Sequence, residues 1–391
     1  MLPPLNELKI LDFTSLLPGP FGSMMLADLG ADIIKVENPG SPDPVRFMPP
    51  IVNGVSALYA HLNRGKRSLC LDLKKKKGGD VIRSLVAEYD ILLEQFRPGV
   101  MARLGLGYDD LKKINPRIIY CSLSGYGQDG PLADRAGHDI NYRALAGIDS
   151  FSGRKETGPC PGAVQLADLC GGSKNLVIAV LTAYINRLRT GTGDHIDLSM
   201  TDGVFALSVF SAAGYLAGGR EPGREQELLN GGVLYDYYQT ADGRYLSVGP
   251  LEQKFFAAFC ETIGHRDLAA KGIMANIADP SIKDAIAATI KSRPLSHWQD
   301  VFSRADACVE PVLSVREACE SALLRQRGMI VSVADRGGEA VRQIGNPIKF
   351  NSYNGVASFP GVAAGTHNEA ILHSFGYSDN DIEAMKKDNV L

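Results

Sequence analysis

The stretch Phe21-Gly-Ser-Met-Met-Leu-Ala-Asp-Leu-Gly-Ala-Asp-Ile-Ile-Lys-Val-Glu37 contains a helical apolar pattern followed directly by a strand. The helical pattern ends at Leu29, and Gly30 suits the position after a helix because glycine accepts a left-handed backbone. A short buried strand, Leu8-Lys-Ile-Leu-Asp-Phe13, precedes it, and Leu17-Pro-Gly-Pro20 is expected to break the chain between the two. These segments together predict a strand–helix–strand unit.

The same alternation continues along the first half of the chain. Further strands are predicted at Ser68–Leu73, Asp90–Glu94 and Ile118–Ser122, and helices at Gly79–Glu88 and Tyr108–Ile114. Strands that alternate with helices of this length are typical of a mainly parallel sheet with helices on both faces. Residues 1 to about 200 are therefore predicted to form a Rossmann-like α/β domain.

The composition changes after two further helical patterns, Gly171–Arg189 and Thr201–Ala217. Residues 218–227 are polar and glycine-rich, as in a linker. Leu234–Val248 is predicted to be a hairpin turning at Ala241-Asp-Gly243. Helical patterns follow at Glu252–Ile263, Ile282–Arg293 and His297–Ala305, so this part is expected to form a small α+β domain. The tail, with Ile330–Val333 and Ile344–Phe350, is predicted to be strand-poor.

The composition excludes several classes of protein. The chain has 391 residues, a formal net charge of −3 and no apolar run near the ~20 residues of a membrane span. This charge gives no basis for nucleic-acid binding, so an anionic ligand must meet local basic groups. Seven scattered cysteines without a Cys-x-x-Cys pair fit a reducing compartment and predict no metal site. We expect a cytoplasmic protein with no membrane partner.

One glycine string matches a dinucleotide fingerprint. Gly125-Tyr-Gly-Gln-Asp-Gly130 follows a predicted strand, but Pro131 comes next and no helical pattern begins before Ile140. The third glycine of a true fingerprint opens a helix. A dehydrogenase is therefore disfavoured, and a binding loop explains the string as well.

Two ionisable residues stand at predicted loop-to-helix junctions. His138, in Arg135-Ala-Gly-His-Asp-Ile-Asn-Tyr-Arg143, precedes the helical pattern Ile140–Ile148, and Asp168 precedes the long helix that starts near Gly171. Two such groups can face one small volume from opposite sides, as proton removal and return at one carbon require. The alternatives are a hydrogen-bonded packing histidine and an acid that only caps its helix.

Many short stretches, in one order along nearly the whole chain, resemble the family III CoA-transferases (the CaiB/BaiF family), and most of all its α-methylacyl-CoA racemase branch. They are Lys9-Ile-Leu-Asp12, Gly19-Pro-Phe21, Leu26–Glu37, Asn63-Arg-Gly-Lys-Arg-Ser68, Phe96-Arg-Pro-Gly99, Ser124-Gly-Tyr-Gly127, Gly137-His-Asp-Ile-Asn-Tyr142 and Val309-Glu-Pro-Val312.

The resemblance implies a particular domain arrangement. The large Rossmann-like domain would comprise residues 1–200 and be completed by the C-terminal tail, residues 330–391. A linker helix and loop at 201–227 would lead to the small α+β domain at 228–315, and a return linker would follow at 316–329. Two identical chains would interlock like rings, although some assemblies pair unequal chains and one chain could then be an inactive CoA-binding subunit.

The resemblance also implies roles for individual residues. Asp168 matches the aspartate that attacks the thioester in the transferases and acts as an acid/base in the racemases. His138 matches the racemase histidine, and Glu252, in Val248-Gly-Pro-Leu-Glu-Gln-Lys-Phe255, matches a glutamate that would orient it; Gln253 and Lys254 depart from the racemase pattern. Together they favour a racemase that inverts the α-carbon of 2-methyl-branched or 2-aryl acyl-CoA. The alternative is a CoA-transferase that uses Asp168.

No cofactor beyond the CoA of the substrate is implied. Its phosphates need local cations, and the cations that fall in family-like motifs are Arg46, Arg64, Lys66, Arg67 and Arg97. Tyr142 is expected to close over the pantetheine arm or to be a core residue. Lys74–Lys77 is expected to be a solvated charge run, and the N–H groups near Ile140 and Leu169 to face the thioester oxygen. The polar segment Ile148–Gly158 is a candidate for the acyl pocket and would suit a polar acyl group.

Overall fold

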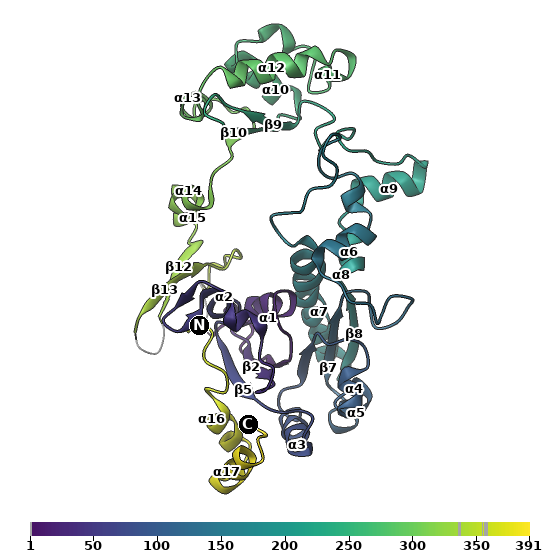
Figure 1. The fold of residues 1–391 in the computed structure, drawn as a ribbon, viewed down its shortest axis with the longest axis vertical. Helices are drawn as coiled ribbons and strands as arrows, with labels where there is room; N and C mark the ends of the chain where they lie inside the picture. The colour runs from purple at the N-terminus through teal and green to yellow at the C-terminus, as the bar shows by residue number, and fades with distance from the viewer. Residues whose placement is uncertain (1, 335–337, 354, 356–358) are drawn as a thin grey trace. The chain divides into compact units, whose positions relative to one another are not determined.

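The computed structural model describes residues 2–334, 338–353, 355 and 359–391. Its contacts divide the chain into two units, each formed from segments that are separate in sequence (Figure 1). The first unit comprises Met1–Ala146, Gly162–Leu207 and Ala322–Leu391. The second comprises Gly147–Pro161 and Ser208–Ser321.

Six parallel strands form the sheet of the first unit, in the spatial order β5-β2-β1-β6-β7-β8. Their bounds are β1 (Lys9–Asp12), β2 (Asp32–Glu37), β5 (Lys66–Cys70), β6 (Ile91–Glu94), β7 (Ile119–Ser124) and β8 (Asp194–Ser199). The chain builds outward from β1 to β5 and then returns to the other side of β1, which is the Rossmann order. The predicted parallel α/β sheet is confirmed.

The central strands are buried on both faces. Ile10 and Leu11 of β1 are fully buried, as are the apolar residues of β6, which is expected where helices cover both sides of a parallel sheet. Helix α1 (Pro18–Asp28) connects β1 to β2 and starts earlier than predicted, because proline in a first helical turn lacks only an N–H that would have no helical partner. Gly30, with φ +102°, ends it as predicted.

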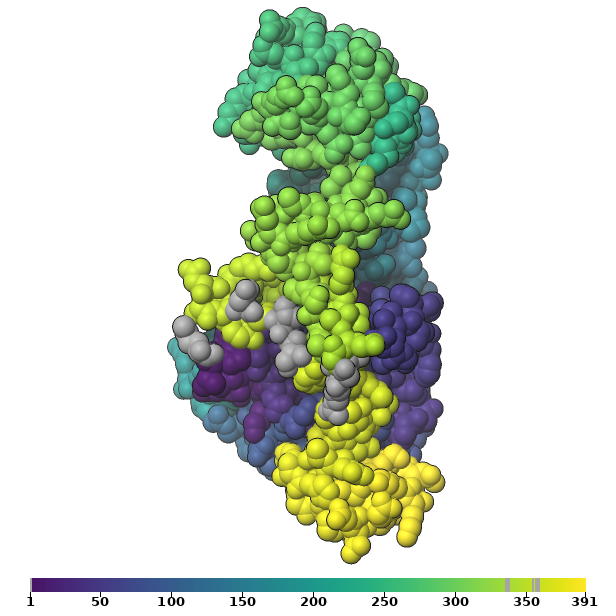
Figure 2. Space-filling view, turned by 90° about the vertical axis from the view of Figure 1, so that its left-hand side faces the viewer, coloured from purple at the N-terminus to yellow at the C-terminus, as the bar shows by residue number. Residues whose placement is uncertain are grey.

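The C-terminal residues complete the first unit. Helices α16 (Asn368–Ser374) and α17 (Asp379–Lys387) bury Ile371 and Met385 in the same core as the sheet. The backbone N–H of Cys70 on β5 donates to Oδ1 of Asn368 at 2.9 Å. Figure 2 shows these yellow residues against the blue and purple N-terminal part of the unit. Before them, β12 (Ile330–Ala334) and β13 (Ala340–Ile344) pair antiparallel, although this region was predicted to be strand-poor.

Other helices of the first unit lie at predicted positions along the chain. Helix α3 (Lys76–Leu85), α5 (Tyr108–Ile114) and α6 (Asp139–Leu145) agree with the predicted patterns. A π-helical segment, η3 (Ala167–Lys174), leads into α7 (Asn175–Thr190). Among the helices that the structure describes, none is long and apolar enough to cross a membrane.

The second unit has its own sheet and core. Strands β9 (Asp236–Gln239), β10 (Tyr245–Val248) and β11 (Val309–Pro311) form an antiparallel sheet, and Gly243, with φ +75°, lies in the predicted hairpin turn. Helices α10 (Gln253–Thr262), α12 (Ser281–Lys291) and α13 (Leu295–Phe302) occupy the predicted positions. Phe256, Ile286 and Trp298 are buried in a core separate from that of the first unit.

The unit boundaries differ from the predicted domain bounds. Gly147–Pro161 was assigned to the large domain, but Arg154 forms ion pairs with Asp236 at 2.7 Å and Glu225 at 2.9 Å, which join this segment to the second unit. The return boundary, between Ser321 and Ala322, falls inside the predicted return linker.

The predicted helix Thr201–Ala217 is also two helices in the structure. They are α8 (Met200–Phe205), in the first unit, and α9 (Val209–Gly218), in the second. An apolar period alone does not locate a break between two apolar helices.

Candidate active site

His138 is the residue immediately before α6. Its backbone is extended, and its N–H donates to Oδ1 of Asn141, three residues on, at 3.0 Å. Asn141 thereby satisfies a backbone group at the helix start, as in the reciprocal half of a capping box. This local arrangement presents the imidazole at the junction between loop and helix, as the sequence predicted.

Asp168 is the second residue of η3. The segment begins beside Asp139, whose Oδ1 accepts the backbone N–H of Ala167 at 2.7 Å and that of Asp168 at 3.3 Å. The other oxygen of Asp139 lies 3.7 Å from the guanidinium of Arg143. The buried carboxylate of Asp139 thus fixes the start of one helical segment to the start of another.

Both candidate bases line one cavity of about 450 Å³. The loop that follows β6 contributes Arg97, and the glycine-rich loop that follows β7 contributes Gly125. Because all these strands are parallel, their carboxyl ends meet at one edge of the sheet, where ligands bind in folds of this kind. The predicted convergence of His138 and Asp168 on one volume is confirmed.

The surroundings of Asp168 raise the pKa of its carboxyl towards neutral pH. Burial raises its pKa to about 6, the negative charge of Asp139 adds to the rise, and the charge of His138 opposes it. A carboxyl with such a pKa can both accept and donate a proton at neutral pH.

Tyr142 closes one side of this cavity. Its hydroxyl donates to the Gly137 carbonyl at 2.5 Å, and its ring lies so close to Gly125 and Gly137 that a Cβ on either would fall 2.5–2.6 Å from ring atoms. These glycines are therefore required by the close approach of the ring. Tyr142 positions the residue before His138, and burial, together with the charge of Asp168, raises its pKa to about 12.

Two other expectations about this region have different outcomes. The N–H of Leu169 was expected to face a thioester oxygen, but it donates to the carbonyl of Gln165, just before η3, at 2.9 Å. The string Gly125–Gly130 does not open a helix, since the next one is α6, so the case against a dinucleotide fingerprint is confirmed. The described residues include no group of His, Cys, Asp and Glu placed to hold a metal ion.

Two of the cations predicted to contact CoA are buried beneath the surface. Lys66 donates from Nζ to Asp12 at 3.1 Å and to the carbonyl of Pro20 at 3.0 Å, and burial lowers its pKa to about 8. Arg64 forms an ion pair with Asp28 at 2.5 Å, and both side chains are at most 2% exposed. Their donors serve the protein interior, and this geometry does not support contact with a phosphate.

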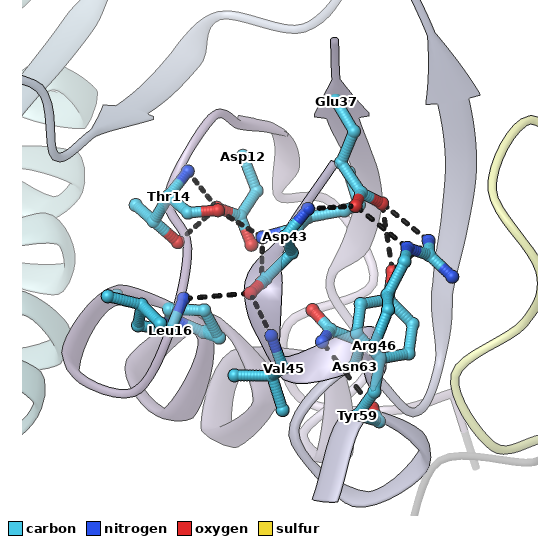
Figure 3. Close-up of polar contacts among 12 residues, drawn as sticks. Asp12, Thr14, Leu16, Glu37, Asp43, Val45, Arg46, Tyr59 and Asn63 are labelled. Carbon is cyan, nitrogen blue, oxygen red and sulfur yellow. Dashed lines mark hydrogen bonds and ion pairs between the residues drawn. The ribbon is translucent and has the colours of Figure 1, made fainter. Parts of the chain in front are cut away.

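Arg46 and Arg67 are also paired with carboxylates. Arg46 donates from Nε and Nη2 to Glu37, at 2.9 and 2.5 Å (Figure 3). It packs on the ring of Tyr59, which also hydrogen-bonds to Glu37. Arg67 donates to both oxygens of Asp32 at 2.8 Å. Among the five predicted cations, only Arg97 is described at the cavity of His138 and Asp168.

A second cavity, of about 490 Å³, lies on the other side of the loop that follows β1. Thr14 after β1 and Phe96 after β6 line it, together with Asn38, Lys74 and Arg103. The sequence analysis missed Arg103 and treated Lys74 as part of a solvated run. Arg103 could have been found from the sequence, because it lies one helical turn beyond the family-like stretch Phe96-Arg-Pro-Gly99.

Glu252 belongs to the second unit, where it is the exposed residue before α10. Its carbonyl accepts the N–H of Phe256. Burial raises the pKa of the Cys308 thiol, and the negative charge of Glu252 adds to that rise. His138 and Asp168 therefore lie in the first unit, and Glu252 lies in the second.

The model of "CoA-transferase family III" matches residues 5–368. The chain is 35% identical to human alpha-methylacyl-CoA racemase over 99% of this chain and 97% of that protein. It is 36% identical to the acetyl-CoA:oxalate CoA-transferase of Acetobacter aceti over 92% of each. A CAIB/BAIF family protein from Brucella suis has a similar structure, with a TM-score of 0.84, 30% identity and coverage of 96% of this chain and 100% of that one. The chain belongs to CoA-transferase family III and is an enzyme of that family, a racemase or a CoA-transferase.

Proposed function

We propose that the protein is a racemase that inverts the α-carbon of 2-methyl-branched or 2-aryl acyl-CoA thioesters. The observation that carries this proposal is the common cavity of His138 and Asp168, together with the raised pKa of Asp168. A transferase needs one nucleophilic carboxylate. A racemase needs two groups that exchange protons, and this cavity offers both.

The reaction is balanced within these two groups. One of them, as the base, takes the α-proton, and the electron pair of the C–H bond passes into an enolate of the thioester. The other, as the conjugate acid, delivers a proton to the opposite face of the same carbon. A carboxyl with a pKa of about 6, as in Asp168, can take either role near neutral pH, and imidazole groups in general can do the same. The proposed reaction therefore needs no cofactor beyond the CoA of the substrate.

The nucleotide end of CoA is assigned in this proposal to the second cavity. That cavity lies where the strand order reverses, between β1 and β6, which is where open parallel sheets bind nucleotides. Lys74 and Arg103 supply positive charge there for the phosphates. The pantetheine arm would then pass Phe96, which lines both cavities, to reach His138 and Asp168.

A CoA-transferase remains the second candidate, because the Acetobacter aceti relative is as similar as the human racemase. In that reaction the Asp168 carboxylate attacks the thioester carbonyl and carries the acyl and CoA groups in turn. His138 would then only bind or support. Its presence in the same cavity as Asp168 is the reason that we favour the racemase.

The two reactions are separated by incubation with acyl-CoA in D2O without any free carboxylic acid. A racemase exchanges the α-hydrogen for deuterium, whereas a transferase has no acceptor and leaves it unexchanged. A panel of straight, 2-methyl, 2-aryl and polar acyl-CoA thioesters would also identify the acyl group. CoA transfer to an added carboxylate without α-exchange would reject the racemase.

We further propose that two copies of this chain form an interlocked homodimer. Support comes from apolar surfaces that each unit leaves uncovered by its own described residues. Phe210 and Leu216 of α9 are 85% and 77% exposed, and Ile178 and Leu188 of α7 are also largely exposed. In the proposed dimer the second unit of one chain brings Glu252 to His138 and Asp168 of its partner.

A further inference from the structure

A leucine with an unusual backbone stands between the two cavities. Leu16 has φ +61°, a left-handed backbone conformation that residues other than glycine and asparagine rarely adopt. It lines the cavity of His138 and Asp168, whereas its neighbours Thr14 and Ser15 line the second cavity. The loop from Phe13 to Leu17 is therefore the partition that a ligand occupying both cavities has to cross.

Two buried, oppositely charged side chains hold this loop at both ends. Oδ1 of Asp43 accepts the N–H of Leu16 at 3.1 Å, and Nζ of Lys35 donates to the carbonyl of Thr14. The ammonium of Lys35 lies 3.5 Å from Oδ2 of Asp43, and each side chain is 1% exposed. Figure 3 shows Asp43 between the loop that carries Leu16 and the turn that carries Val45.

The surrounding contacts leave Asp43 little freedom. Its Oδ1 also accepts the N–H of Val45 at 3.1 Å, and its own N–H donates to Oε1 of Glu37 at 3.0 Å. Thr14 is anchored separately, because Oδ1 of Asp12 accepts its N–H at 2.9 Å and its hydroxyl at 2.5 Å. The hydrogen bond to Asp43 is thus the polar contact that holds the backbone of Leu16 among the described residues.

A buried ion pair by itself is weak support for stability, because removing two charges from water costs about as much as their attraction returns. A pair whose members also bind the backbone on either side of a strained residue has a more specific effect. It favours the one loop conformation in which Leu16 borders the reaction cavity. Asparagine at position 43 would retain the shape of the side chain but remove the carboxylate of Asp43 from beside the ammonium of Lys35.

We infer that Asp43, acting with Lys35, is a positioning residue that keeps Leu16 in its left-handed conformation and so aligns the path of the CoA thioester between the two cavities. Asp43 does not touch the reacting atoms. This inference rests on the proposed binding of an acyl-CoA across both cavities, but it applies to racemase and transferase alike.

A double-mutant cycle tests the clamp. Asp43→Asn leaves an amide oxygen that can still accept the N–H of Leu16, but it removes the charge from that hydrogen bond and from the contact with Lys35, so it should lower kcat/KM for acyl-CoA roughly tenfold. Glycine adopts φ +61° without strain, so in the Leu16→Gly background the same change should cost no more than about threefold. The matched control is Asp28→Asn, which breaks the buried pair with Arg64 away from the loop and should affect Tm but not kcat/KM.

A second measurement does not depend on activity. Hydrogen exchange of the amides from Phe13 to Leu17 should be faster in Asp43→Asn than in the natural protein or in Asp28→Asn. An equal loss of kcat/KM in both backgrounds, or unchanged exchange of the loop, overturns the inference. If the natural protein catalyses neither α-exchange nor CoA transfer, the proposed function fails. The role of Asp43 is then still decided by two measurements, the hydrogen exchange of the loop amides and the affinity for free CoA.

Discussion

Oδ1 of Asp139 accepts the backbone N–H of Asp168 at 3.3 Å, so the residue after one candidate base fixes the backbone of the other. The same carboxylate contributes to the raised pKa of Asp168. One buried acid thus affects both the place and the proton affinity of Asp168. The pair His138-Asp139 supplies one candidate base and the support of the second.

Replacement of Asp139 by asparagine should therefore change the pH dependence of the reaction. The amide oxygen can still accept the N–H of Ala167, but the negative charge is gone, so the pKa of Asp168 falls below about 6, while burial still keeps it above its ordinary value of 3.8. The acid limb of kcat/KM for α-exchange should shift to lower pH. The measurement is a pH profile of deuterium exchange, with Asp129→Asn, an exposed acid in the glycine-rich loop, as the control. An unmoved acid limb would show that Asp168 is not the group that titrates.

Glu94 predicts a pH-dependent stability that is independent of catalysis. Burial raises its pKa from 4.5 to about 7, although Oε2 accepts the N–H of Phe96 at 2.8 Å. Between these two values the unfolded chain has lost the proton while the folded protein keeps it, so stability falls as pH rises and then levels off above about 7. The loss over this window is on the order of 3 kcal/mol.

Glu94→Gln removes that titration while its amide oxygen can still accept from Phe96. The variant should be more stable relative to the natural protein at pH 8 than at pH 4, because these two values lie on either side of the window. Urea unfolding at both pH values measures the difference. The control is Glu88→Gln, in the exposed pair with Lys9, which should show no such trend. A constant difference at the two pH values would contradict the raised pKa.

Arg97 should contribute to binding more than to the chemical step. Loss of a charge-assisted contact costs about 1.5–3 kcal/mol, so Arg97→Ala should raise KM for acyl-CoA roughly tenfold to a hundredfold and change kcat little. Steady-state kinetics measure the split. Lys75→Ala is the control, because Lys75 donates to the Asp388 carbonyl in the C-terminal tail and lines neither cavity among the described residues.

Arg103→Ala is the corresponding test for the second cavity. Its KM should rise for acyl-CoA, and substrates without the 3′-phosphate show whether that phosphate is the group it meets. If Lys75→Ala raised KM strongly while Arg97→Ala and Arg103→Ala left it unchanged, the nucleotide would bind elsewhere.

The proposed dimer predicts complementation. His138→Ala and Glu252→Ala should each be inactive alone, since each lacks one group in both sites. Co-expression of the two chains with different tags, followed by purification of the mixed dimer, should restore one complete site and up to about half of the natural kcat per dimer, as expected for independent sites. The control mixes His138→Ala with Asp168→Ala, two changes in the same unit, which should restore nothing if that unit supplies both bases. An active protein that remains monomeric in solution would refute the shared site.

The sequence alone determined the order of elements and the two junctions that carry the chemistry. Alternating apolar patterns and Gly30 at a helix end are local features, and they predicted the parallel sheet and the places of His138 and Asp168 because local backbone preferences act over a few residues. The hairpin at Ala241–Gly243 was predictable for the same reason.

Only the tertiary structure decided which charges are available. Arg46, Arg64, Lys66 and Arg67 lie in family-like motifs, yet each meets a carboxylate of another element, such as Asp28 of α1 for Arg64. Likewise Arg154 joins its segment to the second unit through Asp236. The energy of a charge depends on burial and on partners brought near by the fold, and neither can be read from the order of residues, because electrostatic interactions act through space.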